Sequence, residues 1–444
     1  MNEKLILVLD DDPTGIQTVH GLTVYMRWSA EIMRHIFEND RVAYIQTNSR
    51  SLTEADAVAT TREIMELAVA AHRATGRNFA VMSRSDSSLR GHFPAEPAAI
   101  RHVWESAGLP PIDGLVFCPF LAEAGRVTID NRHYIRQADG SLTPVADTEF
   151  ARDVVFGYHH SDLTRYIDEK TQGSIPAESV VCIPLAVLDK NDSSAVIEIL
   201  KTVHHFTPVV VNATDYRHLR LFAEALRAVE QTGKRFVFRT AASLVKVYGD
   251  ITDQPLLGRT ELAPYLQSGS VLTVVGSHTS HTTRQLQALL RQESVAVVEL
   301  DVPTLLVDEE EAGQMVQEAV DKCEAVMKQG GHPLLMTSRQ RVSVADAAGN
   351  LTLSQRISGT LSAIVRRLSI RPRAIIAKGG ITSSDIAVQG LGMQKAYVLG
   401  QVRPSIPVVL AQEESRFPNL PYVIFPGNTG QEDDLLTIWN LVQS

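Results

Sequence analysis

Short apolar runs alternate with longer amphipathic stretches along the N-terminal half of the chain. The apolar runs have the length of buried strands, and several stretches between them repeat their apolar positions with helical spacing. The predicted strands are Leu5–Leu9, Leu22–Met26, Val42–Gln46, Phe79–Met82, Gly114–Phe117, Val180–Pro184 and Pro208–Asn212, and the predicted helices are Glu54–Arg73, Ser193–His204 and Tyr216–Glu230. This alternation favours a mostly parallel sheet that is covered by helices.

The same alternation restarts at residue 270 with SVLTVVGSHTSHTTRQLQALL, which predicts a strand, a Gly-Ser turn and a helix. Further strands are predicted at Val295–Leu300, Pro333–Thr337, Arg373–Ala377, Ala396–Leu399, Val408–Ala411 and Tyr422–Phe425, and further helices at Glu309–Lys328, Ser354–Leu368 and Gln431–Val442. The second half therefore predicts a second sheet of the same kind.

A segment rich in glycine, proline and polar residues, 249–270, separates the two patterns. A chain of 444 residues also exceeds what one hydrophobic core usually supports. We therefore predict an α/β protein of two domains, residues 1–250 and 271–444, with a junction at 251–270.

Acidic residues outnumber basic ones, 51 to 42, and the net charge is −9. Without a broad positive field the chain is not expected to bind nucleic acid or an anionic membrane, although a small anionic substrate needs only a local cluster of cations. The three cysteines, Cys118, Cys182 and Cys323, form no CxxC pair, so neither a disulfide framework nor a cysteine-rich zinc site is expected. No apolar segment has the length of a membrane span or a signal peptide, so the cytoplasm is the expected location.

Polar residues follow three of the predicted strands in the first half, and ligands of open α/β sheets bind at the carboxyl ends of strands. The first of these loops contains Asp10, Asp11, Asp12, Thr14 and Gly15. Because adjacent carboxylates repel each other, we interpret this loop as a site for Mg²⁺ or for a substrate hydroxyl. The alternative is a solvated turn in which an aspartate caps the next segment.

The other two loops are QTNSR at 46–50 and SRSDSSLRGHF at 83–93. The last loop gathers hydroxyl and charged groups just before a predicted helix, namely Arg84, Asp86, Ser87, Ser88 and Arg90. Backbone N–H groups at a helix N-terminus and arginine side chains together suit a bound anion. Helix capping combined with a surface ion pair is the alternative interpretation.

The turns of the second half are rich in glycine and poor in acidic residues. They contain Gly276 and Ser277, then Gly379 and Gly380 followed by Thr382, Ser383 and Ser384, and finally Gly427 and Gly430. Glycine lets backbone N–H groups approach phosphate oxygens closely, so the turns predict a phosphate-binding surface, with plain chain connections as the alternative. The chain has no G-x-x-x-x-G-K-[ST] motif and no G-x-G-x-x-G motif after the first strand, so neither a P-loop nor a Rossmann dinucleotide site is expected.

Taken together, these segments resemble the motifs of the four-carbon acid sugar kinase family. The first half is similar to the family's D-D-L-T-G at residues 11–15, T-[DN]-S-R at 47–50 and D-S-T-L-R-G at 86–91. The second half is similar to its G-S-x-S at 276–279, G-G-x-T at 379–382 and G-N-x-G at 427–430. The chain departs from the family at Pro13, where leucine is usual, and at Ser83 and Arg84, near which the family commonly has lysine.

The resemblance implies an N-terminal domain that binds a sugar acid, a C-terminal domain that binds a nucleotide, and a ligand site in the cleft between them. It implies a kinase that transfers the γ-phosphoryl group of ATP, with Mg²⁺, to a hydroxyl of a small sugar acid such as threonate, erythronate or 3-oxo-tetronate. It places Arg50, Asp86, Ser87, Ser88 and Arg90 at the substrate, and Ser277, Gly379, Gly380, Ile381, Thr382 and Gly427 at the nucleotide. Asp12 is the residue expected to orient or deprotonate the attacking hydroxyl, with Asp11 or Asp86 as the alternative, and no metal ligand is assigned.

Two other functions also fit the residues. The segment Asp10–Thr14 satisfies the D-x-D-x-T pattern of haloacid-dehalogenase-like phosphatases, with Asp10 as the nucleophile and Asp12 as the acid/base. That chemistry also needs a late acidic pair after a strand, whereas Asp433 and Asp434 fall within a predicted helix. A non-catalytic sugar-acid sensor on the same scaffold is the second alternative. The sequence leaves the oligomeric state open, a homo-oligomer included.

Overall fold

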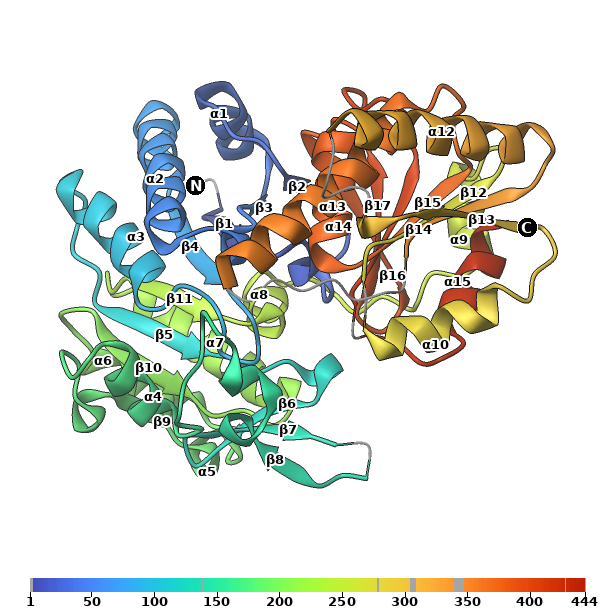
Figure 1. Cartoon of the computed structure of the whole chain (residues 1–444). Coiled ribbons are helices and arrows are strands. Elements are labelled where there is room, and N and C mark those ends of the chain that lie inside the picture. Colours follow the sequence, from blue (N-terminus) through green and yellow to red (C-terminus); the bar gives the residue numbers. More distant parts are fainter. Residues whose placement is uncertain are drawn as a thin grey trace. The chain divides into compact units, whose positions relative to one another are not determined.

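A computed structural model of the chain describes residues 3–137, 139–277, 279–303, 309–338, 347–427 and 429–443. His278 and Asn428, which belong to two of the motifs above, lie outside the described residues. The chain divides into two compact units, Met1–Asp253 and Gln254–Ser444. Figure 1 colours the first unit from blue to yellow-green and the second from yellow to red.

The first unit is built on a parallel sheet. Its strands run in the order β2-β3-β1-β4-β11-β5-β10-β9, and each neighbouring pair is parallel. The bounds are β1 Leu5–Asp10, β2 Leu22–Tyr25, β3 Val42–Gln46, β4 Phe79–Arg84, β5 Gly114–Cys118, β9 Val181–Ile183, β10 Thr207–Val211 and β11 Phe236–Thr240. Strands β1, β3, β4, β5 and β11 are buried along their whole length, which explains why their sequences are mostly continuous apolar runs.

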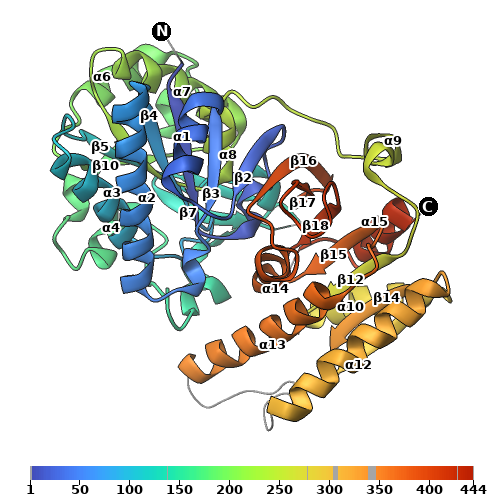
Figure 2. The ribbon, with the colours of Figure 1, turned by 90° about the horizontal axis from the view of Figure 1, so that it is seen from above.

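Helices cover both faces of this sheet. Helices α1 (Ala30–Asn39), α2 (Glu54–Thr75) and α3 (Ala95–Ser106) form one packed group, and α6 (Ser193–Lys201), α7 (Tyr216–Glu230) and α8 (Ala242–Tyr248) form another. Helix α2 connects β3 to β4 and α6 connects β9 to β10, so the two connections run in opposite directions across the sheet. Because crossovers between parallel strands are right-handed, these two helices lie on opposite faces. Figure 2 shows the same helices from above. Two shorter helices, α4 (Leu163–Lys170) and α5 (Leu185–Leu188), lie between β8 and β10 in the chain.

The ends of α2 follow from its local sequence. Thr53 caps the first turn by accepting a hydrogen bond from Asp56 N at 3.2 Å. Gly76 follows the last residue with a φ of +69°, a conformation that glycine adopts without strain. Between these ends, α2 buries Ile64 and Met65 in the core of the first unit.

A small antiparallel sheet stands apart from the parallel one, between β5 and α4 in the chain. Its strands are β6 (Arg126–Ile129), β7 (Arg132–Arg136) and β8 (Leu142–Pro144), in the order β6-β7-β8. The sequence does not predict this sheet, because its strands are short and mix charged residues with apolar ones.

The sheet of the second unit runs in the order β13-β14-β12-β15-β18-β17-β16. Its pairs are parallel from β13 to β18, whereas β17 is antiparallel to both β18 and β16. The strands are β12 Val271–Val275, β13 Val295–Leu300, β14 His332–Thr337, β15 Ala374–Lys378, β16 Lys395–Arg403, β17 Ile406–Ala411 and β18 Pro421–Phe425. The helices are α9 Arg259–Leu262, α10 Ser280–Leu289, α12 Glu309–Lys328, α13 Ala347–Arg367, α14 Gly380–Asp385 and α15 Asp434–Gln443. In Figure 1, α12, α13 and α14 lie on one face of this sheet and α10 and α15 on the other.

The predicted fold class is confirmed, since the chain forms mostly parallel sheets that are covered by helices. The strand β11 is not predicted, because Arg239 interrupts its apolar run. The limits 1–250 and 271–444 stay predictions. Within the described residues, no helix has both the length and the apolar character that crossing a membrane requires.

Candidate active site

The three polar loops of the first unit begin at one edge of its sheet. Strand β1 pairs in parallel with β3 and β4, and Asp10 is in register with both Gln46 and Arg84. Each of these residues is the last of its strand, so the loops at 11–15 and 85–91 leave the sheet beside the turn that carries Arg50. Residues far apart in the sequence are thereby brought together at the carboxyl ends of the strands.

Arg50 connects the first loop with the third. Its Nη2 lies 2.6 Å from Asp12 Oδ2, its Nε lies 3.3 Å from Asp11 Oδ2, and its Nη1 lies 3.7 Å from Asp86 Oδ2. A substrate carboxylate would therefore have to share this guanidinium with carboxylates of the chain itself. The contact of Arg50 with the substrate stays a prediction, and its contacts with the acidic residues are an additional role.

Asp12 is held from two sides. Its Oδ1 accepts a hydrogen bond from Thr14 N at 2.7 Å and another from the Thr14 hydroxyl, while its Oδ2 faces Arg50. Asp12 is the N-cap of a 3₁₀ turn, Pro13–Ile16, in which proline occupies the first position. The carboxylate is therefore oriented before any ligand is present.

Exposure distinguishes the three consecutive aspartates. The side chain of Asp12 is 21% exposed, whereas those of Asp11 and Asp10 are 2% and 1% exposed. A substrate can therefore reach Asp12 directly. Asp10 is bonded to Arg84 Nη1 at 2.9 Å and packs against Gly15, so it is too buried to attack a phosphate ester as the phosphatase alternative requires.

Burial and neighbouring charge shift the pKa values of these carboxyls in opposite directions. Burial raises the pKa of Asp10 to about 7, although Arg84 opposes this shift. Burial also raises the pKa of Asp11. Burial alone would raise the pKa of Asp12 as well, but Arg50 and two hydrogen bonds outweigh it and hold that pKa below its usual value. Asp12 is therefore ionised at neutral pH.

The raised pKa of Asp10 predicts a pH-dependent stability. The native protein binds this proton more tightly than the unfolded chain, so the stabilisation present below about pH 4 is lost as the pH rises to about 7. The loss amounts to at most about 1.4 kcal/mol per pH unit. We expect Asp10→Asn, which cannot titrate, to show a smaller fall in melting temperature than the wild type between pH 5 and pH 7.

A suitable control is Asp139→Asn, because hydrogen bonds from Ser141 lower the pKa of Asp139 and place its titration below this range. Its melting profile should run parallel to that of the wild type. Parallel profiles for Asp10→Asn and the wild type would show that Asp10 does not titrate in this window.

The third loop contains an ion pair beside two buried hydroxyls. Arg90 Nε donates to Asp86 Oδ2 at 2.7 Å. Burial alone would raise the pKa of Asp86, but Arg90 and Arg50 outweigh it and lower that pKa. Ser87 and Ser88 are 5% and 2% exposed, whereas the side chain of Arg90 is 29% exposed. The structure thus joins Asp11, Asp12, Arg50, Asp86 and Arg90 in one network of ion pairs and sets the two serines beside it.

Arg126 of β6 is a further cation at this loop, and sequence analysis missed it. Its Nη2 lies 3.4 Å from Ser88 Oγ, and its Nε is buried without a hydrogen-bond partner. The guanidinium carbons of Arg126 and Arg90 lie 5.5 and 5.0 Å from the centre of the Phe150 ring. Burial lowers the pKa of Arg126, so an anion beside Ser88 would stabilise its charged form. No sequence pattern points to Arg126, because the strand that carries it is not predicted.

A second missed group supports the turn that carries Arg50. Glu96 accepts hydrogen bonds from Ser49 Oγ at 2.6 Å and from Arg239 Nη1 at 2.7 Å. Arg239 Nη1 also donates to Ser83 Oγ at 2.9 Å, and the side chains of Glu96 and Arg239 are 7% and 3% exposed. A buried ion pair of this kind fixes the geometry of both loops. The signal in the sequence was the charge of Arg239 within an otherwise apolar run.

In the second unit, the predicted glycine turns surround one cavity of about 230 Å³. Its lining residues are Gly276, Ser277, Ile357, Ser358, Gly379, Gly380, Ile381, Thr382 and Gly427. The turns follow β12, β15 and β18, which are parallel neighbours, so they meet at one edge of the sheet. All six residues predicted at the nucleotide are thus brought together.

Two of these glycines are required by the local structure. Gly379 has a φ of +121°, which is strained for any other residue. At Gly276 a Cβ atom would collide with the side chain of Thr382. Both N–H groups are used within the fold, because Gly276 N donates to Lys378 O at 3.3 Å and Gly379 N donates to Phe425 O at 2.9 Å. These glycines therefore shape the wall of the cavity.

Lys378, the last residue of β15, directly precedes this turn, and sequence analysis gave it no role. It is fully buried, its Nζ donates to Pro426 O at 3.1 Å, and it lies 3.7 Å from the centre of the Phe425 ring. Burial lowers the pKa of Lys378 to about 7, with Asp434 partly opposing the shift. A lysine within the buried end of a strand was the available signal.

Across the part of the chain that the structure describes, no group of three or more His, Cys, Asp or Glu side chains is arranged to hold a metal ion. Mg²⁺ in phosphate-binding sites is commonly held by one or two carboxylates together with phosphate oxygens and water. The partly exposed carboxylate of Asp12 fits that shared arrangement.

Comparison with known proteins adds the following. A family model described as a sugar-binding N-terminal domain matches residues 6–248, and one described as a nucleotide-binding C-terminal domain matches residues 272–435. The D-threonate kinase of Salmonella typhimurium (strain LT2) is 25% identical over 369 residues, which are 80% of this chain and 78% of that protein.

A crystal structure from Salmonella typhimurium LT2, provisionally described as a tRNA synthase, matches with a TM-score of 0.69 and 18% identity over 98% of both chains. This likeness shows the fold. A domain of unknown function from Bordetella bronchiseptica with bound citrate covers 99% of this chain and 98% of its own at 20% identity, but its TM-score is 0.39 and no argument rests on it.

Proposed function

Because this chain belongs to the four-carbon acid sugar kinase family, we propose that it is an ATP-dependent kinase that phosphorylates a hydroxyl of a small sugar acid or oxo sugar acid, such as threonate or 3-oxo-tetronate. The observation that carries the proposal is the partly exposed carboxylate of Asp12 beside Arg50, at the carboxyl ends of the parallel strands. Its similarity to a D-threonate kinase supports the kinase class and the kind of acceptor.

Asp12 would accept a hydrogen bond from the attacking hydroxyl and aim its oxygen at the phosphorus atom. Its lowered pKa makes it a weak base, which suits a phosphoryl transfer whose transition state is loose and needs alignment more than early deprotonation. The bonds from Thr14 and the ion pair with Arg50 would keep the carboxylate in this orientation.

The third loop would hold the acid group and the other hydroxyls of the substrate. Arg90 is its most exposed cation, and Ser87 and Ser88 supply hydroxyls beside it. Arg126 also lies beside Ser88, with its Nε lacking a hydrogen-bond partner, so it is the cation here that an incoming carboxylate could pair with, whereas Arg90 already pairs with Asp86 and Asp153. With the acid group of the substrate at the third loop, Arg50 would hold Asp11, Asp12 and Asp86 in place and would also approach the substrate.

The cavity of the second unit would receive the nucleotide phosphates, with Gly276, Ser277, Gly379 and Gly380 around them. ATP supplies the phosphoryl group when bound, Mg²⁺ would neutralise phosphate charge, and Asp12 is the carboxylate that would help to hold the metal ion. A phosphate in this cavity would favour the charged form of Lys378, which directly precedes Gly379 and whose pKa burial lowers to about 7.

The test is a coupled ADP-release assay with Mg-ATP on D- and L-threonate, D- and L-erythronate and 3-oxo-tetronate. We expect ADP production that depends on one of these acids and stops without Mg²⁺. ADP release that stays at background with every acid would exclude the proposed function. Hydrolysis of p-nitrophenyl phosphate without ATP would favour the phosphatase alternative, and binding of an acid without turnover would favour the sensor.

A further inference from the structure

Three consecutive carbonyl groups of the third loop are held by buried side chains from a distant part of the chain. The pairs are His133 Nε2 with Ser87 O, the Tyr158 hydroxyl with Ser88 O, and the Tyr166 hydroxyl with Leu89 O, each at 2.8 Å. The three donors are 0%, 3% and 1% exposed, respectively. Water therefore cannot readily replace them, and each carbonyl depends on its own donor.

The direction of the histidine bond follows from its partner. A carbonyl oxygen only accepts, so Nε2 of His133 carries the hydrogen. Burial lowers the pKa of His133 to about 4, which keeps the ring neutral near pH 7. Its other nitrogen, Nδ1, lies 2.9 Å from the hydroxyl of Thr128 on the neighbouring strand, and this contact orients the ring.

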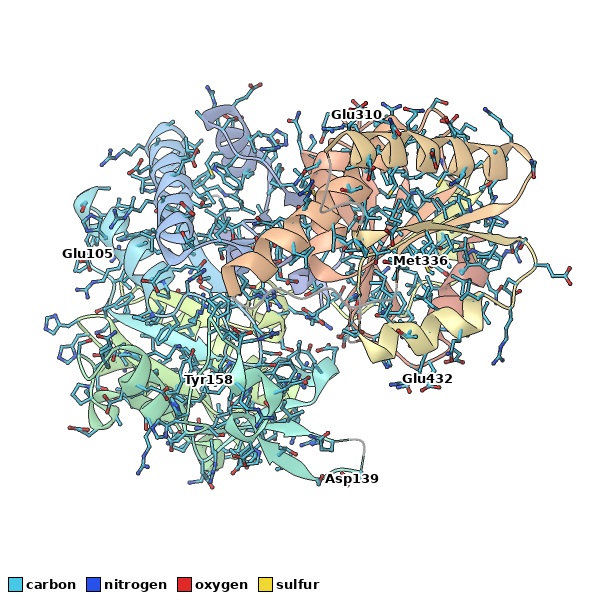
Figure 3. All side chains as sticks on the ribbon, viewed as in Figure 1. Glu105, Asp139, Tyr158, Glu310, Met336 and Glu432 are labelled. Carbon is cyan, nitrogen blue, oxygen red and sulfur yellow. The ribbon has the colours of Figure 1, made fainter. Side chains whose placement is uncertain are left out.

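All three donors belong to the segment that follows β5 and includes the small antiparallel sheet. His133 lies on β7 and Tyr166 on α4, while Tyr158 lies in the connection between β8 and α4. Figure 3 labels Tyr158 in the green part of the ribbon. The Tyr158 and Tyr166 rings pack edge to face with centres 5.4 Å apart, so the two hydroxyls are held by the packing of their own rings.

The loop that these donors hold has an unusual backbone. Leu89 has a φ of +69°, and a residue other than glycine adopts this conformation only when its surroundings impose it. Leu89 N bonds back to Asp86 O at 3.0 Å, which closes the turn around Ser87 and Ser88. The carbonyl bonds therefore hold the peptides that carry both serine hydroxyls.

We propose that Tyr158, through its bond to Ser88 O, is a positioning residue that sets the direction of the Ser87 and Ser88 side chains towards the acceptor substrate, with His133 and Tyr166 holding the adjacent peptides. The carbonyl that Tyr158 holds is the central one of the three, and it belongs to Ser88 itself. His133, Tyr158 and Tyr166 thus act on the acceptor through the third loop, in addition to the direct approach proposed for Arg126 of β6. This inference rests on the proposed function of that loop.

The test compares Tyr158→Phe with the wild type in two measurements. We expect the KM for the sugar acid to rise about tenfold, as loss of one buried hydrogen bond would produce, while the KM for ATP stays unchanged. We also expect faster amide hydrogen exchange in peptides that cover residues 85–91, with unchanged exchange in the second unit.

The matched control is Tyr25→Phe. The Tyr25 side chain is also buried in the first unit, and its hydroxyl donates to Asp40 Oδ2 at 2.7 Å. Tyr25 is the last residue of β2, which β3 and β1 separate from β4 and the third loop. Loss of stability alone would make both variants melt earlier and leave both KM values unchanged. The proposal is wrong if the KM for the sugar acid is the same in Tyr158→Phe as in Tyr25→Phe.

A combined variant distinguishes an effect of Tyr158 on the serine side chains from a general loss of stability. If Tyr158 acts through Ser87 and Ser88, then adding Tyr158→Phe to the variant Ser87→Ala/Ser88→Ala should raise the KM for the sugar acid no further than that variant alone. Additive effects would contradict this route. If the wild type phosphorylates no sugar acid, the proposed function fails, while the exchange measurement still decides whether Tyr158 holds the loop, and unchanged exchange at 85–91 rejects it.

Discussion

Replacing Asp12 with asparagine should lower kcat for sugar-acid phosphorylation by about 10²- to 10⁴-fold. The amide keeps the size of the side chain and can still accept the bonds from Thr14, but it loses the negative charge that faces Arg50 and the substrate hydroxyl. Because the proposed function assigns substrate binding chiefly to the third loop, the KM for the sugar acid should change much less than kcat.

The measurement is steady-state kinetics of purified Asp12→Asn with the best sugar acid found in the assay. Asp162→Asn is the matched control, since Asp162 makes the same local cap, accepting bonds from Thr164 N at 2.9 Å and Thr164 Oγ1 at 2.7 Å. That variant changes the same kind of cap, and Arg165 contacts Asp162 through its backbone N–H at 3.2 Å, so kcat should stay close to that of the wild type. A kcat for Asp12→Asn within a few fold of the wild type would remove Asp12 from the reaction.

The strands and loops at the sheet edge could be predicted because local sequence determines them. Buried parallel strands such as β1 and β3 are apolar along their length, and the first polar residue after each run marks the start of a loop. Three such loops had to meet once the strands were neighbours, and the register of Asp10 with Gln46 and Arg84 confirms that they begin at the same level.

The partners of these loops could not be predicted, because they come from distant segments. Glu96 and Arg239 are 143 positions apart in the sequence, and Tyr158 is 70 positions from Ser88. Charged or hydroxyl-bearing residues on helices and short strands usually face solvent, and nothing local shows that these are buried. Only the packed structure reveals which polar groups of the core support the site.

The structure also changes the meaning of the acidic run. Its three aspartates look equivalent in the sequence, whereas in the fold Asp10 lies beneath the loop with Arg84, Asp11 lies between Arg84 and Arg50, and Asp12 reaches the surface. Side chains alternate between the two faces of a sheet only within a strand. In the turn after β1, the direction of each aspartate depends on the backbone of the turn, which the sequence pattern does not predict. This division of positions supports one reactive carboxylate with two buried ones below it.

Arg50→Met should reduce both stability and activity, since it removes the cation that three carboxylates share. Asp11 would lose one of its two arginines and Asp12 its nearest one, and Arg90 would remain as the neighbour of Asp86. Loss of one partner from a buried ion pair costs about 3 kcal/mol, so the melting temperature of the variant should fall clearly. We expect kcat/KM to fall by about 100-fold or more, because the orientation of Asp12 and its charge both depend on this contact.

The pH dependence of kcat distinguishes the effect on Asp12 from general damage. In the wild type, Arg50 helps to hold the pKa of Asp12 below its usual value, so kcat should not decline on its acid side until well below neutral pH. Without Arg50, burial raises that pKa, and the acid limb of kcat should move to higher pH. Arg50→Lys keeps a positive charge but has a single nitrogen in place of three, so its acid limb should lie between the other two.

Arg217→Met serves as the control for the loss of an arginine. Arg217 Nη2 lies 2.8 Å from Asp215 Oδ2, but that pair is exposed, so its removal should leave the melting temperature and the pH profile nearly unchanged. An acid limb that stays in place in Arg50→Met, measured well below its melting temperature, would mean that another group sets the charge of Asp12. A shift that is partly restored in Arg50→Lys would instead establish that the arginine controls the carboxylate through its charge, because packing at this position is lost in both variants.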